Sequence, residues 1–247
     1  MNKYYKKLKE MAGLAPINGR DKVSDITIPN NSAPGQISYS QSGEDLIIKF
    51  IFDALNIKNP TYVDIGAHHP RYINNTAIFY NDGSTGINIE PDPDLYKRFV
   101  DERPNDINLN LGIGKHKGVL TFYIMSTPTL NTFSLEEAKR YEKEGFSILK
   151  TLSVNVDNIN DVIKQYVGKA PGFVNLDVEG IDFEILKSYD FKKYSPTVWC
   201  IETISFSQTG RGIKDNKVIK FMGSKGYMLY ADTQINSIFV KKAMWLR

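Results

Sequence analysis

The chain has 247 residues, of which 41% are hydrophobic and 24% are charged, so it is long enough for one large α/β domain with a full core. Lys and Arg outnumber Asp and Glu by only 31 to 28, which argues against a nucleic-acid partner, because such proteins gather basic residues on one face. The single cysteine, Cys200, stands in the apolar run TVWCIET, so it cannot form an internal disulfide and favours a reducing compartment.

The first residues, MNKYYKKLKEMAGLAP, are basic but lack the apolar centre of a signal peptide. No segment reaches the roughly 18 apolar residues of a spanning helix, so we expect a cytoplasmic protein without a transmembrane segment. Residues 17–38 are rich in Asn, Ser, Pro and Gly and show no sustained hydrophobic period, as linkers do. The sequence predicts an N-terminal arm and linker over residues 1–38 and a single domain over residues 39–247.

From Tyr39 onward, helix-like and strand-like runs alternate, which predicts a mostly parallel sheet with helices on both faces. Helices are expected at residues 44–56, 75–82, 93–103, 134–145, 160–167, 181–189 and 218–226. Strands are expected at residues 61–65, 85–90, 106–111, 118–125, 150–156, 172–178, 197–203, 227–232 and 235–242. The last two strands are separated by a very short turn, so they must pair antiparallel.

Two of the expected helices begin with the spacing of a capping box, in which a Ser hydroxyl accepts a hydrogen bond from the backbone three residues on. These pairs are Ser42 with Asp45 and Ser134 with Glu137. Between the strands at 118–125 and 150–156, a polar and aromatic segment around residues 126–150 interrupts the alternation. Such insertions commonly form lids, and we expect this one to help cover a substrate.

Acidic residues or a glycine follow four of the expected core strands. They are Asp64 and Gly66 after the first strand, Glu90 after the second, Asp177 and Glu179 after the strand at 172–178, and Glu202 after the next. In doubly wound sheets, ligands bind beyond the carboxyl ends of the strands, so these side chains are candidates for one site. For any single acid, capping of the next helix or binding of water is an equally good explanation.

The turn YVDIGAHHP limits the kind of ligand. It contains one glycine, Gly66, and lacks the G-x-G-x-x-G pattern that binds the pyrophosphate of a dinucleotide. An adenosine ligand without phosphates would suit this turn, with Glu90 accepting hydrogen bonds from the ribose hydroxyls. S-adenosylmethionine meets this description, and its positive sulfonium would be favoured by Asp64 and Asp177.

The chain resembles the FkbM-type S-adenosylmethionine-dependent methyltransferases in an ordered series of motifs between Tyr39 and Thr203. The motifs are SQSGEDLI, YVDIGAHHP, NNTAIFY, GINIEPDP, NTFS, FVNLDVEGIDFEILKS and CIET. The resemblance implies a class I methyltransferase (Rossmann-like) fold with seven strands, the last of them antiparallel. It also implies O-methylation of a hydroxyl on a sugar, glycan or natural product, so the expected partner is a small-molecule or glycan acceptor.

The resemblance also implies positions for the cofactor. By motif position, Asp64, Gly66 and Ala67 face the methionine part and Glu90 faces the ribose. Asn110 and Leu111 border the adenine, and Asp177 lies beside the transferred methyl group. We place Gln41 near the carboxylate of the cofactor or near the acceptor, because helix capping does not account for it.

A hydroxyl acceptor must lose its proton, and several residues are candidates to take it. His68 and His69 follow the glycine turn, and a His has a pKa near neutral. The alternative for each is a cap on the next helix or a hydrogen bond within the loop, and His116 is expected to be solvated. Asp177 and Glu202 are also candidates, because clustered carboxylates repel and one of them then has a raised pKa.

A divalent metal at Asp177, Glu179 and Glu202 is possible but not favoured, because no ligand run has a diagnostic spacing, and we assign no metal ligand. Two other functions remain open. The first is a binding module that has the methyltransferase fold and binds the cofactor but has lost turnover. The second, less favoured, is a nicotinamide oxidoreductase.

Overall fold

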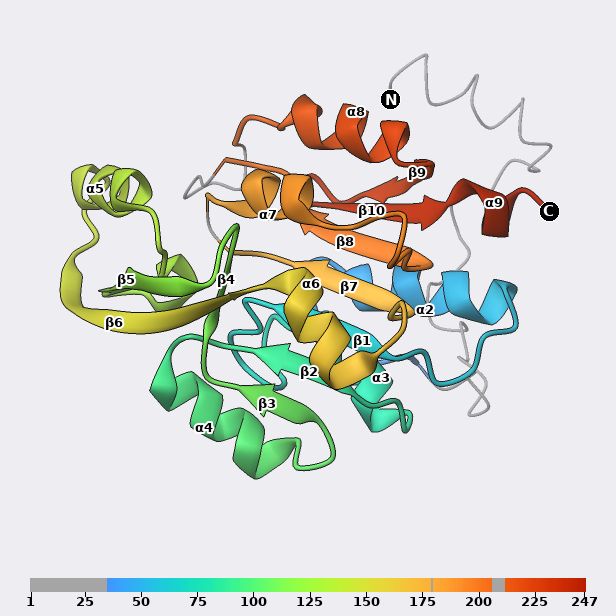
Figure 1. The fold of residues 1–247 in the computed structure, drawn as a ribbon, viewed down its shortest axis with the longest axis horizontal. Helices are drawn as coiled ribbons and strands as arrows, with labels where there is room; N and C mark the ends of the chain where they lie inside the picture. The colour runs from blue at the N-terminus through green and yellow to red at the C-terminus, as the bar shows by residue number, and fades with distance from the viewer. Residues whose placement is uncertain (1–34, 179, 206–211) are drawn as a thin grey trace, which may run out of the picture. The chain divides into compact units, whose positions relative to one another are not determined.

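A seven-stranded sheet forms the centre of the unit from Ser38 to Arg247 in this computed structural model, which describes residues 35–178, 180–205 and 212–247 (Figure 1). Its strands, in spatial order, are β3 (Ile107–Leu109), β2 (Gly86–Ile89), β1 (Tyr62–Ile65), β7 (Phe173–Leu176), β8 (Val198–Glu202), β10 (Asn236–Lys241) and β9 (Tyr227–Asp232). The first five of these strands are parallel to one another, and β10 is antiparallel to both β8 and β9. The predicted seven-stranded, mostly parallel sheet with an antiparallel last strand is confirmed.

Helices cover both faces of this sheet, as the alternation of the sequence predicted (Figure 1). Alternate residues of each strand point to opposite faces, so Val63 and Tyr62 of β1 enter different apolar cores. One core includes residues of α6 (Ile159–Val162), its π-helical continuation (Ile163–Val167), α7 (Asp182–Ser188) and α8 (Asn216–Ser224). The other includes residues of α2 (Glu44–Ala54) and α3 (Ala77–Asn81). Near the β3 edge lies α4 (Pro93–Glu102), and α9 (Lys242–Trp245) follows β10.

A second, three-stranded sheet stands beside the first at the end where the parallel strands terminate (Figure 1). It consists of β4 (Gly112–Gly114), β6 (Ile148–Asn158) and β5 (Gly118–Met125), in this spatial order. Between β5 and β6 the chain forms a 3-10 turn (Pro128–Leu130) and α5 (Leu135–Lys143). The predicted strands at 118–125 and 150–156 therefore exist but pair with each other and not with the central sheet.

The two predicted capping boxes have different outcomes. Ser134 caps α5, because its hydroxyl accepts from the N–H of Glu137 at 3.2 Å. The prediction for Ser42 was wrong, since Gly43, which has no side chain, stands at the N-cap of α2. Asp45 does not complete a capping box with Ser42, because its carboxylate accepts from the hydroxyls of Ser38 and Ser40 at 2.7 and 2.8 Å.

Arg103, at the end of α4, is a buried arginine that organises the loop after β1. Its side chain is 2% exposed, and Nη2 donates to the carbonyl of Pro70 and to Oδ1 of Asn74, both at 2.7 Å. Nη1 donates to the Thr76 hydroxyl at 2.9 Å. Asn74 and Thr76 in turn donate to the same oxygen of Asp64, so the guanidinium acts on the end of β1 through two intermediaries.

Across residues 35–178, 180–205 and 212–247, no helix has the length and apolar character needed to cross a membrane.

Replacing Arg103 by Met should lower the free energy of unfolding by about 3 kcal/mol or more, because several buried acceptors lose their donor. Arg98→Met is the matched control on the same helix, since Arg98 is exposed, and it should change stability by less than about 0.5 kcal/mol. Urea denaturation at neutral pH measures both. Equal losses in the two variants would contradict the role of Arg103 in holding this loop.

Candidate active site

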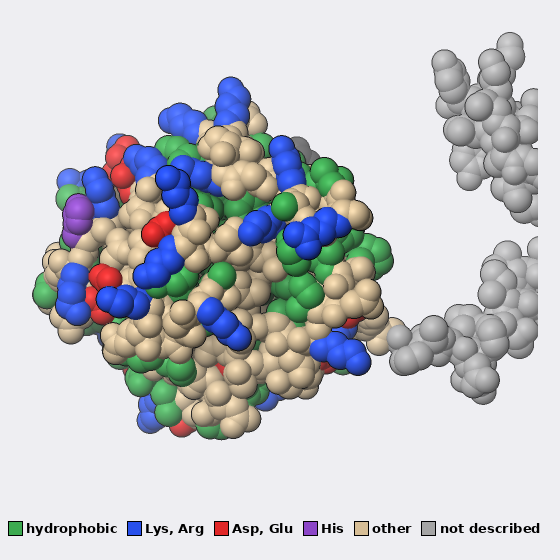
Figure 2. Space-filling view, turned by 45° about the vertical axis from the view of Figure 1, so that its right-hand side comes forward, with side chains coloured by type: hydrophobic (Ala, Val, Ile, Leu, Met, Phe, Trp, Pro, Cys, Tyr) green, Lys and Arg blue, Asp and Glu red, His purple; other side chains and the backbone are tan. Residues whose placement is uncertain are grey.

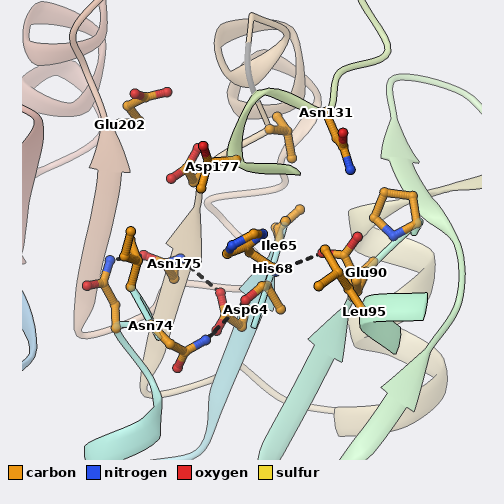
Figure 3. A pocket seen from close by; sticks show the side chains of 18 of the residues that line it. Asp64, Ile65, His68, Asn74, Glu90, Leu95, Asn131, Asn175, Asp177 and Glu202 are labelled. Atoms are coloured by element: carbon orange, nitrogen blue, oxygen red, sulfur yellow. Dashed lines mark hydrogen bonds between the residues drawn. The ribbon is translucent and has the colours of Figure 1, made fainter. Parts of the chain in front are cut away.

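The carboxyl ends of β1, β2, β7 and β8 meet at one cavity of about 310 Å³ (Figure 3). This volume is within the range of about 300–1,000 Å³ that is usual for small-molecule sites. Nine of the eleven predicted site residues line it: Gln41, Asp64, Gly66, Ala67, His68, Glu90, Leu111, Asp177 and Glu202. His69 and Asn110 do not line it.

Gly66 allows the ends of β1 and β7 to approach each other. Its φ of +76° is in the left-handed region, and a Cβ atom there would lie 1.8 Å from the carbonyl oxygen of Asp177. Any side chain at this position would therefore force the two strand ends apart. The N–H groups of Gly66 and Ala67 both donate to the carbonyl of Ile89 at 3.1 Å, which also ties the turn to β2.

Glu90 is the best-defined acid of the site. Its side chain is held by two backbone donors, with Oε2 accepting from His68 N at 2.7 Å and Oε1 from Asp92 N at 2.8 Å. The residue is 4% exposed, and burial raises the pKa of its carboxyl to about 8. Each carboxylate oxygen keeps a second lone pair at the cavity wall, so Glu90 has capacity for two further donors.

Asn110 supports Glu90 from outside the cavity. Its side-chain amide donates to the carbonyl of Glu90 at 2.9 Å and to that of Pro91 at 3.1 Å. Of the two residues expected to border the ligand, Leu111 lines the cavity and Asn110 does not. Asn110 instead supports the backbone of Glu90 and Pro91.

Asp64 is fully buried beneath the cavity and is already well satisfied by hydrogen bonds. Its carboxylate accepts from Thr76 at 2.7 Å. It also accepts from Asn175 at 2.8 Å and from Asn74 at 3.1 Å (Figure 3). Burial raises the pKa of this carboxyl, and these hydrogen bonds oppose the rise. Asp64 thus joins β1 and β7 to the loop of residues 66–76 and adds negative charge below the site.

The two histidines face different surroundings. His69 Nδ1 accepts from the N–H groups of Arg71 and Tyr72 at 3.0 and 3.1 Å, so this residue closes the turn. His68 lines the cavity with a left-handed φ of +56°. Burial lowers the pKa of His68 to about 4, with the neighbouring His69 contributing, so its imidazole is neutral and weakly basic at pH 7.

Asp177 and Glu202 stand at the ends of the adjacent strands β7 and β8. Figure 3 shows both at the same side of the hollow, across from Glu90. Burial, with Asp182 and Asp64 nearby, raises the pKa of the Asp177 carboxyl above its ordinary value. Neighbouring carboxyl groups that are buried favour the protonated form, so Asp177 is the candidate base that this geometry supports.

The described lining of the cavity contains four carboxylates, those of Asp64, Glu90, Asp177 and Glu202, and no Lys or Arg. Basic residues are not scarce in this protein, since Figure 2 shows many Lys and Arg side chains on one face. The remaining wall on the Glu90 side is apolar, with contributions from Ile89, Leu95, Leu111, Ile113, Phe122, Leu130 and Phe133. This arrangement suits a ligand with an apolar flat part and a positive charge.

Several residues that line the cavity were not predicted from the sequence. Asn175 is a polar residue inside the otherwise apolar strand β7, and this interruption was the available signal. Asn131 and Thr129 come from the insertion at 126–150, of which residues 128–131 and 133 line the cavity. Tyr141, an aromatic residue of that insertion, is fully buried in the small core that α5 forms with β5 and is not available to a ligand.

Within the described part of the chain, no group of three or more His, Cys, Asp or Glu side chains has the arrangement of a metal site. Glu179, the third acid considered for a metal, lies outside the described residues.

A protein-family model gives the decisive comparison. The model described as the methyltransferase FkbM domain matches residues 64–229, which is more than half of the chain. The chain belongs to the FkbM methyltransferase family. The matched region contains every residue of the cavity wall from Asp64 to Ser205, and the seven-stranded sheet is the class I methyltransferase fold expected from the motifs. Comparison with curated proteins finds no match.

Solved structures with a related fold include three methyltransferases. A methyltransferase FkbM from Methylobacillus flagellatus KT is 14% identical with a TM-score of 0.43, covering 74% of this chain and 43% of that protein. A Burkholderia thailandensis 1,6-didemethyltoxoflavin-N1-methyltransferase, with bound S-adenosylhomocysteine and 1,6-didemethyltoxoflavin, is 7% identical with a TM-score of 0.41, covering 81% and 77%. A Geobacter metallireducens GS-15 precorrin-6y C5,15-methyltransferase is 12% identical with a TM-score of 0.39, covering 79% and 87%. This chain spans less than half the length of the first of these proteins.

The raised pKa of Glu90 predicts how stability depends on pH. A carboxyl whose pKa is about 8 in the folded chain but about 4.3 when unfolded favours folding only while it is protonated. Its contribution is therefore lost as the pH rises towards 8, by up to about 1.4 kcal/mol per pH unit. Glu90→Gln should show a smaller fall in unfolding free energy than the wild type between pH 6.5 and 8. Parallel curves from urea denaturation of the two proteins would contradict the raised pKa.

Proposed function

We propose that this domain transfers the methyl group of S-adenosylmethionine to a hydroxyl oxygen of a small-molecule or glycan acceptor. Membership of the FkbM methyltransferase family supports methyl transfer as the reaction class. The observation that carries the choice of cofactor is the described lining of the cavity, with four carboxylates and no Lys or Arg. Such a wall favours a cationic ligand and disfavours one with phosphates, because a nearby positive charge favours the ionised form of these acids and a phosphate opposes it.

The residues present fit this cofactor. Glu90 would accept from the two ribose hydroxyls with the lone pairs that His68 N and Asp92 N leave available. The apolar wall that includes Leu95 and Leu111 suits an adenine ring, and Asp177 would lie towards the positive sulfur. S-adenosylmethionine would supply an electrophilic methyl group on that sulfur. Two features argue against a nicotinamide dinucleotide. The acids would repel its pyrophosphate, and the β1 turn has a single glycine in place of the glycine-rich pattern that binds a pyrophosphate.

The protein must then position the acceptor hydroxyl and take its proton. We propose Asp177, supported by Glu202, as the group that accepts the proton. These carboxylates face the cavity, and the raised pKa of Asp177 is closer to the operating pH, as an efficient base requires. His68 is a weaker candidate, since its lowered pKa of about 4 makes the imidazole a poor proton acceptor. His69 uses Nδ1 within its own turn.

Glu90→Gln should weaken binding of S-adenosylhomocysteine by more than about tenfold at pH 8.5, since hydrogen bonds to a charged acceptor are lost. Wild-type affinity should rise as the pH increases from 6.5 to 8.5, because the ribose hydroxyls donate to ionised Glu90, whose pKa is about 8. In the variant this rise should be much smaller. Isothermal titration calorimetry measures both effects.

Asp94→Asn is the control for this measurement, because Asp94 is an exposed acid in the first turn of α4. It should bind like the wild type. If the wild type gives no heat with S-adenosylmethionine or S-adenosylhomocysteine at millimolar concentration, the proposed cofactor is wrong.

Asp177→Asn should lower kcat by about a hundredfold or more, the usual contribution of a general base. For the wild type, kcat/KM should rise with pH as Asp177 loses its proton. His68→Asn should retain this pH profile, and Asn tolerates the left-handed backbone at position 68 better than most residues. Transfer of radiolabelled methyl groups is the readout. If His68→Asn removes the rise with pH while Asp177→Asn keeps it, the base is His68. Cofactor binding without methyl transfer would favour a binding module that has lost turnover.

A further inference from the structure

A second cavity of about 370 Å³ adjoins the proposed cofactor cavity. The two share three lining residues, Glu202, Ile204 and Ser205, which follow directly from the end of β8. Glu202 lies across the site from Glu90 (Figure 3), so the second cavity opens on the side away from the proposed ribose position. A molecule in it would approach the Asp177 and Glu202 pair from outside.

Besides the end of β8, three separate parts of the chain form the walls of this second cavity. The insertion contributes Glu137 and Arg140 from α5, and the chain entering α7 contributes Gly180, with Asp182 and Phe183 from the first turn of that helix. The start of α8 contributes Asp215, Lys217 and Val218, and Lys214 precedes it. The insertion and α8 are far apart in the sequence, so this cavity exists only in the folded chain.

The charges in the two cavities differ. The first has no Lys or Arg in its described lining, whereas the second has three basic residues, Arg140, Lys214 and Lys217. The second cavity also has acids, but each has a partner within the protein. Glu137 pairs with Arg140, Asp215 accepts from Lys217 N at 2.8 Å, and Asp182 accepts from Val178 N at 3.1 Å. Glu202 stands at the strand end next to that of Asp177.

The basic groups are less fully occupied than the acids. Lys214 Nζ is held by Asp232 Oδ1 at 2.7 Å and by the carbonyl of Gln234 at 3.0 Å. In contrast, the exposed ammonium of Lys217 has no ion pair or hydrogen bond among the described residues. Arg140 has a buried Nε atom without a hydrogen-bond partner in the same part of the chain. Donors thus remain on two parts of the lining, one on the insertion and one on α8.

We infer that the second cavity binds the acceptor and that the acceptor has an anionic group, a carboxylate or a phosphate, which Arg140 and Lys217 hold. This inference rests on the proposed function and adds a substrate class to it. The hydroxyl to be methylated would lie towards Asp177, and the anionic group would lie between α5 and α8. An anion is disfavoured in the first cavity by its acidic side chains and the lack of Lys or Arg in its described lining. The second cavity offers an anion the Lys217 ammonium and the Arg140 guanidinium.

The test uses the full chain saturated with S-adenosylhomocysteine and three probes: D-glucuronate, D-glucose 6-phosphate and D-glucose. Saturation-transfer NMR titrations should give at least one acidic probe an affinity about tenfold or more above that of glucose. The probe that binds more tightly shows whether the site prefers a carboxylate or a phosphate. The preference should weaken as salt rises, because the attraction is between charges.

Lys217→Met should reduce the affinity of the preferred acidic probe about fivefold or more and leave that of glucose unchanged. Lys220→Met is the matched control, since Lys220 is exposed on the same helix but does not line the cavity. It should behave like the wild type. Unchanged binding of S-adenosylhomocysteine shows that each variant is folded.

Three results would overturn the inference: glucose binding as tightly as the acids, no binding by any of the three probes, or equal losses in Lys217→Met and Lys220→Met. Each leaves the proposed function standing if S-adenosylhomocysteine still binds. Failure of S-adenosylhomocysteine to bind the wild type would instead remove the proposed function, so the two failures are distinguishable.

Discussion

The site depends on a buried carboxylate, that of Asp64. Three donors from two segments converge on it: Asn74 and Thr76 between β1 and α3, and Asn175 in β7. Arg103 holds two of these donors from the other side, through Asn74 Oδ1 and the Thr76 hydroxyl. A charge this deep is tolerated only when its hydrogen bonds are complete. Those bonds fix the loop that presents Gly66, Ala67 and His68 to the cavity, so the geometry of the site follows from satisfying one acid.

This arrangement explains why the acids of the site behave differently. Asp64 has three side-chain donors and serves the scaffold, while Glu90 has two backbone donors and keeps lone pairs for a ligand. Asp177 stands beside Glu202 at the ends of adjacent strands, with Asp64 and Asp182 also nearby. All three lie at strand ends and have raised pKa values because of burial. Their partners, and not their position in the sheet, distinguish a structural acid from a ligand-binding acid and from a candidate base.

Much of the fold was predictable from the sequence because it is encoded locally. Apolar runs identify β1, β2, β7 and β8, and the short turn before Asn236 requires an antiparallel pair. The pairing of β5 with β6 was not predictable, because it joins segments separated by α5 and leaves no local mark. Arg103 was missed for a related reason, since nothing around it in the sequence shows that it is buried. The acids of the site were predictable from the sequence, because acidic residues stand where the expected strands end. The different environments of His68 and His69, and the outward position of Asn110, depend on hydrogen bonds that form only in the folded loop.

The position of β10 has a consequence for how the domain forms. This strand comes last in the chain, yet it lies between β8 and β9 and not at the edge of the sheet. During synthesis, β8 therefore exposes an unpaired edge until nearly the whole chain has emerged, and exposed edges invite pairing with other chains. Completion of the sheet must await the arrival of residues 236–241. A chain that ends before them would lack Asn236 in the cavity wall and would leave the edge of β8 unpaired beside Glu202.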